Sequence, residues 1–161
     1  MIRFSSVSDA LIDEKGRVVL PSSFKKTMGD LDDEPLIIEK DIYKPRLNIY
    51  PERYWNERLE SMEKQLNPFD DEDADLLSRI YSNYATVTMA PNGRINIPDK
   101  FMAYANINRE VIFAGNGVSI SLWDEKAFDE DEKGGEELRK KYKKRLGNPQ
   151  KDAYWNLFIH R

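Results

Sequence analysis

One short charged sequence occurs twice in this chain and holds the residues whose types and spacing could do chemistry. Residues 13–17 read Asp-Glu-Lys-Gly-Arg, and residues 90–94 read Ala-Pro-Asn-Gly-Arg. Glycine permits the positive φ of a tight turn, and such a turn exposes its side chains. Arginine offers a planar fork of donors to a guanine edge or a phosphate, and lysine offers a point charge. The chemistry indicated is recognition of an anionic or hydrogen-bonding ligand at two protruding turns.

The residues around the two turns also repeat. Gly, Arg, Pro and Phe keep one register in residues 13–24 and 90–101. Apolar and β-branched runs bounded by turn residues predict strands at 7–12, 18–20, 36–39, 46–50, 85–89, 95–97, 110–114 and 118–123. Helical spacing predicts helices from Pro21, Pro51 and Pro98, and over about 70–84. We expect residues 18–20 to return along 7–12 as a hairpin, and each repeat to continue with a short helix, a second hairpin and a helix.

Two of the predicted helices have an apolar stripe. On the first it comprises Trp55, Leu59, Met62 and Leu66, and on the second Leu77, Ile80, Tyr81 and Tyr84. Such stripes are typical of a core or a subunit interface rather than a ligand site. The acidic run at 70–75 lacks the Gly and the distal Glu of an EF-hand, so we interpret it as a charged helix start.

Composition limits the class of protein. The 161 residues allow one domain or two small dependent halves, and 40% hydrophobic residues can form a core. The chain has no cysteine, which excludes disulfides, thiol nucleophiles and cysteine-ligated zinc. Neither a signal peptide nor a membrane span is predicted, so we expect a cytoplasmic protein with no membrane partner. The net charge of −4 argues mildly against nucleic acid, but a local patch can differ from the total.

Enzymatic interpretations have little support. The single histidine, His160, is the penultimate residue, so neither a Ser-His-Asp triad nor a multi-histidine metal site is favoured. Acidic pairs are plentiful and a carboxylate-only hydrolase stays open, but no pair is singled out. We therefore expect no enzyme activity, no cofactor and no metal.

Several segments in order resemble the MraZ family of bacterial transcriptional regulators. The resemblance covers roughly residues 1–130 and rests on Leu11 to Arg17 with Pro21, Leu47 to Pro51 with Trp55, Leu66 to Pro68, Gly93-Arg94, and Leu122 to Glu125. It implies an α+β, β-rich fold of tandem swapped-hairpin repeats (a double-split β-barrel, as in AbrB and MazE) with flanking helices. We therefore divide the chain into a first repeat at 1–66, a linking helix at 67–84 and a second repeat at 85–130, followed outside the resemblance by a basic helix and apolar tail at 131–161.

The resemblance also implies a function. Members of that family are sequence-specific DNA-binding repressors of the division and cell-wall gene cluster, and they bind repeated promoter sites as homo-oligomeric rings. We would then expect a cytoplasmic, nucleoid-associated protein whose partners are double-stranded DNA and further copies of itself. Carried over by position, the DNA-binding residues are Lys15, Gly16, Arg17, Asn92, Gly93 and Arg94. Asp13 would brace the first turn by pairing with Arg17.

The second turn departs from the family pattern. Ala90 replaces the second Asp and Asn92 replaces the second Lys, so only Gly93 and Arg94 match. This turn would contact DNA more weakly, or read bases through the Asn92 amide. The alternative function is a ring-forming interaction protein with weak or lost DNA binding. Taken alone, the first turn could also be an ordinary polar turn with a surface ion pair, but the repeat in register favours a functional role.

The C-terminal segment lies outside the resemblance. Residues 139–145 are basic except for Tyr142, and they predict either a solvated helix facing acidic neighbours such as 130–132 or an auxiliary phosphate contact. The tail at 154–159 is apolar, and we expect it to dock on its own body or on a neighbouring subunit.

Overall fold

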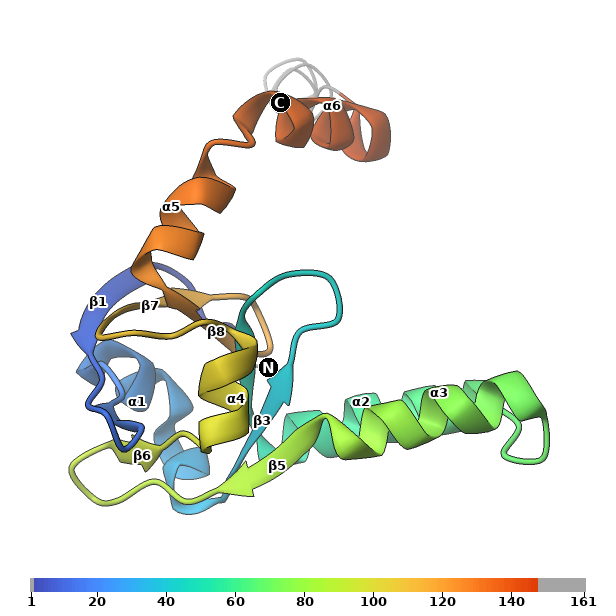
Figure 1. The fold of residues 1–161 in the computed structure, drawn as a ribbon, viewed down its shortest axis with the longest axis horizontal. Coiled ribbons are helices and arrows are strands. Elements are labelled where there is room, and N and C mark those ends of the chain that lie inside the picture. Colours follow the sequence, from blue (N-terminus) through green and yellow to red (C-terminus); the bar gives the residue numbers. More distant parts are fainter. Residues whose placement is uncertain (1, 148–161) are drawn as a thin grey trace, which may run out of the picture. The chain divides into compact units, whose positions relative to one another are not determined.

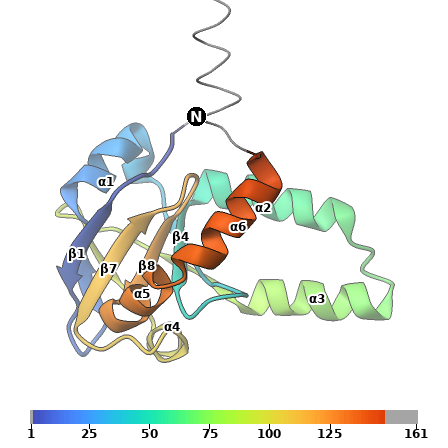
Figure 2. The ribbon, with the colours of Figure 1, turned by 90° about the horizontal axis from the view of Figure 1, so that it is seen from above.

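An antiparallel sheet and a small ribbon organise the chain up to Ala127, and the computed structural model describes residues 2–147. The strand order in the sheet is β1 (Val7–Leu11), β7 (Glu110–Gly115), β8 (Ile120–Asp124), β4 (Leu47–Pro51), β3 (Leu36–Lys40) and β5 (Tyr84–Val87) (Figures 1 and 2). The ribbon pairs β2 (Arg17–Val19) with β6 (Arg94–Asn96). The segments predicted as separate repeats, 1–66 and 85–130, thus both contribute strands to one sheet.

Helices connect the strands. Their bounds are α1 (Ser22–Met28), the 3-10 helix η1 (Gly29–Asp33), α2 (Glu52–Gln65), α3 (Asp71–Ser82), α4 (Asp99–Tyr104), α5 (Glu125–Glu132) and α6 (Gly135–Leu146). Pro21, Pro51 and Pro98 each precede a helix, which confirms the predicted starts. The chain forms two units, one ending at Ala127 and one beginning at Phe128. The predicted tail at 154–159 and His160 lie outside the described residues.

The strands that flank the first turn do not form the predicted hairpin. β1 pairs with β7, and β2 pairs with β6, so neither strand is the ladder partner of the other. The prediction that 18–20 returns along 7–12 is therefore wrong in its pairing. The hairpins predicted at 36–50 and 110–123 are confirmed as the β3–β4 and β7–β8 pairs. Exchange of strands between repeats is the swapped-hairpin arrangement that the family resemblance implied.

Helix α3 is shorter than predicted. Asp70 caps the start of α3 by accepting a hydrogen bond from the Asp73 N–H at 3.1 Å. The helix ends at Ser82, before the predicted end at residue 84. Tyr84 instead begins β5, and Tyr81 is 45% exposed, so both were wrongly assigned to the buried stripe. From Tyr84 the chain pairs with β3 as strand β5, and this pairing prevails over the helical spacing of the apolar residues. On α2, Trp55 is buried as expected and packs between the rings of Tyr50 and Tyr84.

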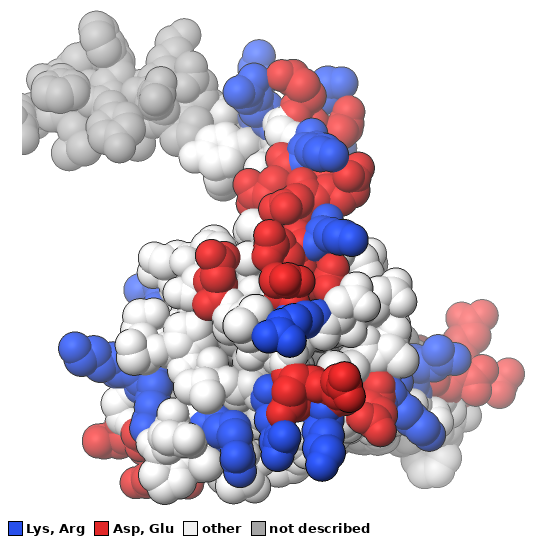
Figure 3. Space-filling model, turned by 60° about the vertical axis from the view of Figure 1, so that its left-hand side comes forward, with Lys and Arg blue, Asp and Glu red and all other residues white. Residues whose placement is uncertain are grey.

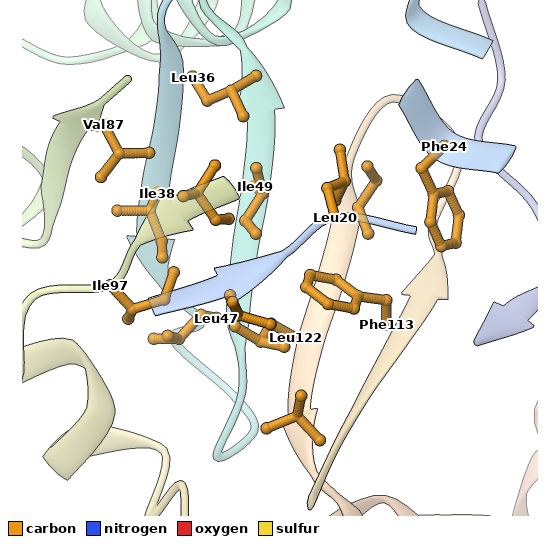
Figure 4. Close-up of a cluster of buried hydrophobic side chains, with 14 of the residues drawn as sticks. Leu20, Phe24, Leu36, Ile38, Leu47, Ile49, Val87, Ile97, Phe113 and Leu122 are labelled. Atoms are coloured by element: carbon orange, nitrogen blue, oxygen red, sulfur yellow. The ribbon is translucent and has the colours of Figure 1, made fainter. Parts of the chain in front are cut away.

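One hydrophobic core joins the sheet, the ribbon and α1. It includes side chains from both predicted repeats, which converge in Figure 4: Leu20, Phe24, Leu36, Ile38, Leu47, Ile49, Val87, Ile97, Phe113 and Leu122. The ribbon contributes Val18 and Ile95, which are buried between exposed neighbours. This alternation anchors one face of the ribbon in the core and leaves the other face to solvent.

A buried polar cluster closes the β3–β4 loop. The Asp41 carboxylate accepts hydrogen bonds from Arg46 Nε at 2.8 Å, Asn48 Nδ2 at 3.0 Å and the Tyr43 N–H at 2.8 Å. Burial alone would raise the pKa of Asp41, but these hydrogen bonds and the Arg46 charge hold it below its ordinary value. The cluster lies beside a cleft of about 440 Å³ that α2 and α3 also line.

Two glycines at the turns have different surroundings. Gly16 and Gly93 have φ values of 84° and 87°, which L-residues rarely adopt. A Cβ on Gly16 would lie 2.2 Å from the backbone oxygen of Ile97, whereas on Gly93 its closest neighbour would be Leu20 O at 3.4 Å. The first turn therefore approaches the opposite strand more closely than the second does.

We expect Gly16→Ala to destabilise the protein more than Gly93→Ala. Positive φ costs both variants about 1–2 kcal/mol, and Gly16→Ala adds a clash with backbone that cannot rotate away. Gly117→Ala is the control for strain alone, because its φ is 79° and nothing lies within 4 Å of the added Cβ. Urea unfolding followed by circular dichroism measures all three. Equal losses for Gly16 and Gly117 would contradict the close approach.

The Asp41 cluster predicts a pH-dependent stability. Because the folded-state pKa of Asp41 is lowered, its contribution is present above the ordinary value of 3.8 and is lost as pH falls through the folded-state pKa. We expect Asp41→Asn to cost about 3 kcal/mol near neutral pH. The difference from wild type should shrink only below about pH 4 in urea titrations. The exposed Asp9→Asn is the control, and a difference that does not vary with pH would disprove the role of the Asp41 charge.

Candidate nucleic-acid interface

The first turn is held by its own backbone and by Asp13. The Gly16 N–H donates to Asp13 O at 3.0 Å, and the Asp13 N–H donates to Arg17 O at 3.1 Å. Asp13 Oδ1 accepts from the N–H groups of Lys15 and Arg17 at 3.0 and 2.9 Å. Asp13 Oδ2 accepts from Arg17 Nε at 2.6 Å. One carboxylate thus fixes both the turn and the arginine.

These contacts leave the cations available to a ligand. The backbone hydrogen bond from Arg17, together with its side-chain bond and charge, lowers the pKa of Asp13, so its carboxylate is ionised at neutral pH. The bond to Asp13 uses Arg17 Nε, and the two terminal amino groups are the remaining donors of that guanidinium. Lys15 and Arg17 are both exposed. The turn thus presents the positioned guanidinium of Arg17 beside the ammonium group of Lys15.

The second turn has the same backbone with fewer side-chain bonds. The Gly93 N–H donates to Ala90 O at 2.8 Å, and the Ala90 N–H donates to Arg94 O at 2.9 Å. Asn92 Oδ1 accepts from the Arg94 N–H at 3.1 Å, replacing one of the bonds that Asp13 makes in the first turn. Ala90 has no side-chain acceptor, so the side chain of Arg94 lacks the brace that Asp13 provides.

Ribbon β2–β6 joins the two turns with approximate twofold symmetry. The Leu20 N–H donates to Gly93 O at 2.9 Å, and the Ile97 N–H donates to Gly16 O at 2.7 Å. The cross-strand pairs are Arg17 with Asn96, Val18 with Ile95, and Val19 with Arg94. Each turn is therefore hydrogen-bonded to the strand that follows the other turn.

The outer face of this ribbon brings the two arginines together. Arg17, Val19, Arg94 and Asn96 are exposed, while Val18 and Ile95 point into the core. Arg17 and Arg94 are diagonal neighbours in the ladder, a relation that separates residues by roughly 7–8 Å. Residues far apart in sequence thus form one basic surface.

A hollow of about 410 Å³ lies on this surface. It is lined by Lys15, Arg17, Thr88, Ala90, Arg94, Ile95 and Asn96. Of the six predicted contact residues, Lys15, Arg17 and Arg94 line the hollow, whereas Gly16, Asn92 and Gly93 shape the turns around it. Asn96 and Thr88 were not predicted. Asn96 follows Arg94 by two positions, so strand alternation could have placed it on the same face.

The unit that carries the basic surface is acidic overall. Residues 1–127 hold 16 basic and 22 acidic residues, which gives this unit a formal net charge of −6. Figure 3 shows Lys and Arg side chains gathered along the lower edge of the unit, with Asp and Glu among them. Basic side chains thus gather locally in a unit whose net charge is negative.

Residues 2–147 contain no group of three or more His, Cys, Asp or Glu side chains placed to hold a metal ion. None of the described helices has both the length and the apolar character needed to cross a membrane.

Comparison with known proteins identifies the family. The family model of the MraZ protein, described as antitoxin-like, matches residues 80–147. The "Transcriptional regulator MraZ" of Bacteroides thetaiotaomicron is 34% identical over 123 residues, which cover 76% of this chain and 79% of the relative. That of Bacteroides fragilis is 32% identical over 155 residues, covering 92% and 98%. That of Nitrosospira multiformis is 32% identical over 118 residues, covering 73% and 79%. The chain, with its swapped-hairpin α+β fold, belongs to the MraZ family.

Proposed function

We propose that this protein is a DNA-binding transcriptional regulator and that the outer face of the β2–β6 ribbon is its DNA contact. The observation that carries the proposal is the shared hollow that brings Lys15, Arg17 and Arg94 from two distant turns onto one surface. The relatives named as transcriptional regulators support the same class of function. An enzyme activity forms no part of the proposal.

The ribbon has features suited to duplex DNA. A two-stranded β ribbon fits the major groove, where arginine can bind guanine O6 and N7. Asp13 restrains Arg17 before binding, so less side-chain entropy is lost on contact. Asn92 and Asn96 add amide groups, which can bind adenine edges. In this arrangement Gly16 and Gly93 let the backbone turn sharply, so that the cations lie close to the DNA.

The proposed role includes a target and an assembly state. The protein would act in the cytoplasm, on the nucleoid, as a repressor of the division and cell-wall gene cluster. Three cations per chain supply few phosphate contacts, and one chain alone should bind weakly. Copies assembled into a homo-oligomeric ring would engage repeated promoter sites together and gain affinity through effective concentration.

A second candidate function follows from the unequal turns. The second turn lacks a carboxylate at Ala90 and a cation at Asn92, and the surrounding unit is acidic. A ring-forming interaction protein with weak or lost DNA binding would show these features. Anisotropy with a fluorescent duplex from the promoter upstream of its own gene separates the two candidates, because the second predicts weak binding or none.

Arg17→Ala should weaken binding to that promoter duplex by roughly 10–100-fold, and Arg94→Ala by less. Arg17 is braced by Asp13 and lies beside Lys15, whereas the second turn has neither a carboxylate to brace Arg94 nor a lysine beside it. Arg53→Ala is the matched control, because Arg53 is also exposed and paired with a carboxylate, that of Glu34. Equal binding by wild type and Arg17→Ala would refute the proposed contact, and a larger loss for Arg94→Ala would reverse the ranking of the turns.

Restoring the missing side chains should strengthen the second turn. We expect the double variant Ala90→Asp/Asn92→Lys to bind the same duplex more tightly and with a steeper dependence on salt. The new carboxylate can brace Arg94 as Asp13 braces Arg17, and each new phosphate contact steepens the slope of log K against log salt by about 0.9. An unchanged slope would show that the second turn does not reach the DNA. The single variant Ala90→Asp separates the brace from the added cation.

A further inference from the structure

Helix α6 concentrates positive charge. Of the seven residues 139–145, six are basic, and every side chain of this helix is exposed among the described residues. Arg139 and Lys140 pair with Glu136 and Glu137 at 2.9 and 3.5 Å. The other four cations, Lys141, Lys143, Lys144 and Arg145, come after these pairs.

The helix geometry separates three of these cations, Lys141, Lys143 and Lys144, from the apolar side of α6, whereas Arg145 lies about 60° from the middle of that side. Leu138, Tyr142 and Leu146 are spaced by four residues and form one stripe, with exposed fractions of 66%, 50% and 61%. At 100° per residue, Lys144 lies nearly opposite the stripe, and Lys141 and Lys143 lie on its two flanks. Packing of the stripe against any surface would therefore leave a basic face uncovered.

The charge balance of the rest of the protein leaves a deficit for DNA binding. The ribbon hollow has three cations, and they belong to a unit with a net charge of −6. Phosphate neutralisation by Lys and Arg supplies most of the sequence-independent affinity for DNA. A second source of positive charge would add affinity to each ribbon, and α6 carries the longest basic run in the sequence.

We propose that α6 is a second DNA-binding element that contacts the phosphodiester backbone through Lys141, Lys143, Lys144 and Arg145. This inference rests on the proposed function and extends it to a site outside the ribbon. Phosphate contacts fix position and carry no direct sequence information. In this division of roles the ribbon selects the operator, and α6 adds affinity for any duplex.

The test uses the full chain with Lys141→Gln, Lys143→Gln, Lys144→Gln and Arg145→Gln combined. Glutamine keeps a high helix propensity, and circular dichroism checks the helix. The control combines Arg53→Gln, Lys64→Gln, Arg79→Gln and Lys126→Gln, which remove the same charge from exposed positions off α6. Anisotropy with the promoter duplex and a scrambled duplex of equal length, at several salt concentrations, gives the affinity and the salt slope.

We expect the α6 variant to lose affinity by a similar factor on both duplexes, and its salt slope to fall by about 0.9 for each phosphate contact removed. The control variant should keep more of the wild-type slope. A triple variant with Lys141→Arg, Lys143→Arg and Lys144→Arg should bind like wild type, because it keeps the charge.

Five results would overturn the inference. An α6 variant with the wild-type slope, or with the slope of the control variant, would show that α6 does not contact DNA, while leaving the ribbon proposal intact. Loss on the promoter duplex alone would assign base recognition to α6. A change in the mass of the assembly by light scattering would assign α6 to subunit contacts. Absence of any DNA binding by wild type would remove the proposed function and this inference together.

Discussion

The reciprocal pairing of β2 with β6 is the constraint on which the rest of the structure depends. The glycine carbonyl of each turn accepts a hydrogen bond from the segment that follows the other turn, at 2.7 and 2.9 Å. Buried backbone groups need partners, and here those partners come from the other repeat. The same exchange buries Val18 beside Ile95 and exposes Arg17 and Arg94 on one side. One set of hydrogen bonds thus builds both the core and the basic surface.

Local features of the fold could be predicted from the sequence, because they depend on residues close together in the chain. The positive φ at Gly16 and Gly93 and the helix starts after Pro21, Pro51 and Pro98 follow from rules for single residues or turns. Pairing of β1 with β7 could not be predicted in this way. A turn with a glycine resembles a hairpin turn whichever strand its neighbours pair with, and long-range competition decides the partner.

For the candidate site, the sequence could predict which residues take part but not that they lie close together. The repeat indicates Arg17 and Arg94, the family resemblance adds Lys15, and the structure brings all three to one hollow. Their proximity depends on the β2–β6 register, which no local pattern specifies. Thr88 was missed because it precedes the second turn, where the sequence offers no motif. The loss of Tyr84 from its predicted helix has a similar cause, since pairing with Glu39 on β3 outweighs helical periodicity.

The position of β1 in the sheet has a consequence for synthesis on the ribosome. β1 comprises residues 7–11, but its ladder partner β7 comprises residues 110–115. At about 5–20 residues per second, the nascent chain carries an unpaired first strand for roughly 5–20 s before β7 emerges. The outward residues of β1 include Val7 and Leu11, with Asp9 between them. Because charge on an exposed strand opposes edge-to-edge pairing, Asp9 disfavours association of this strand with another nascent chain.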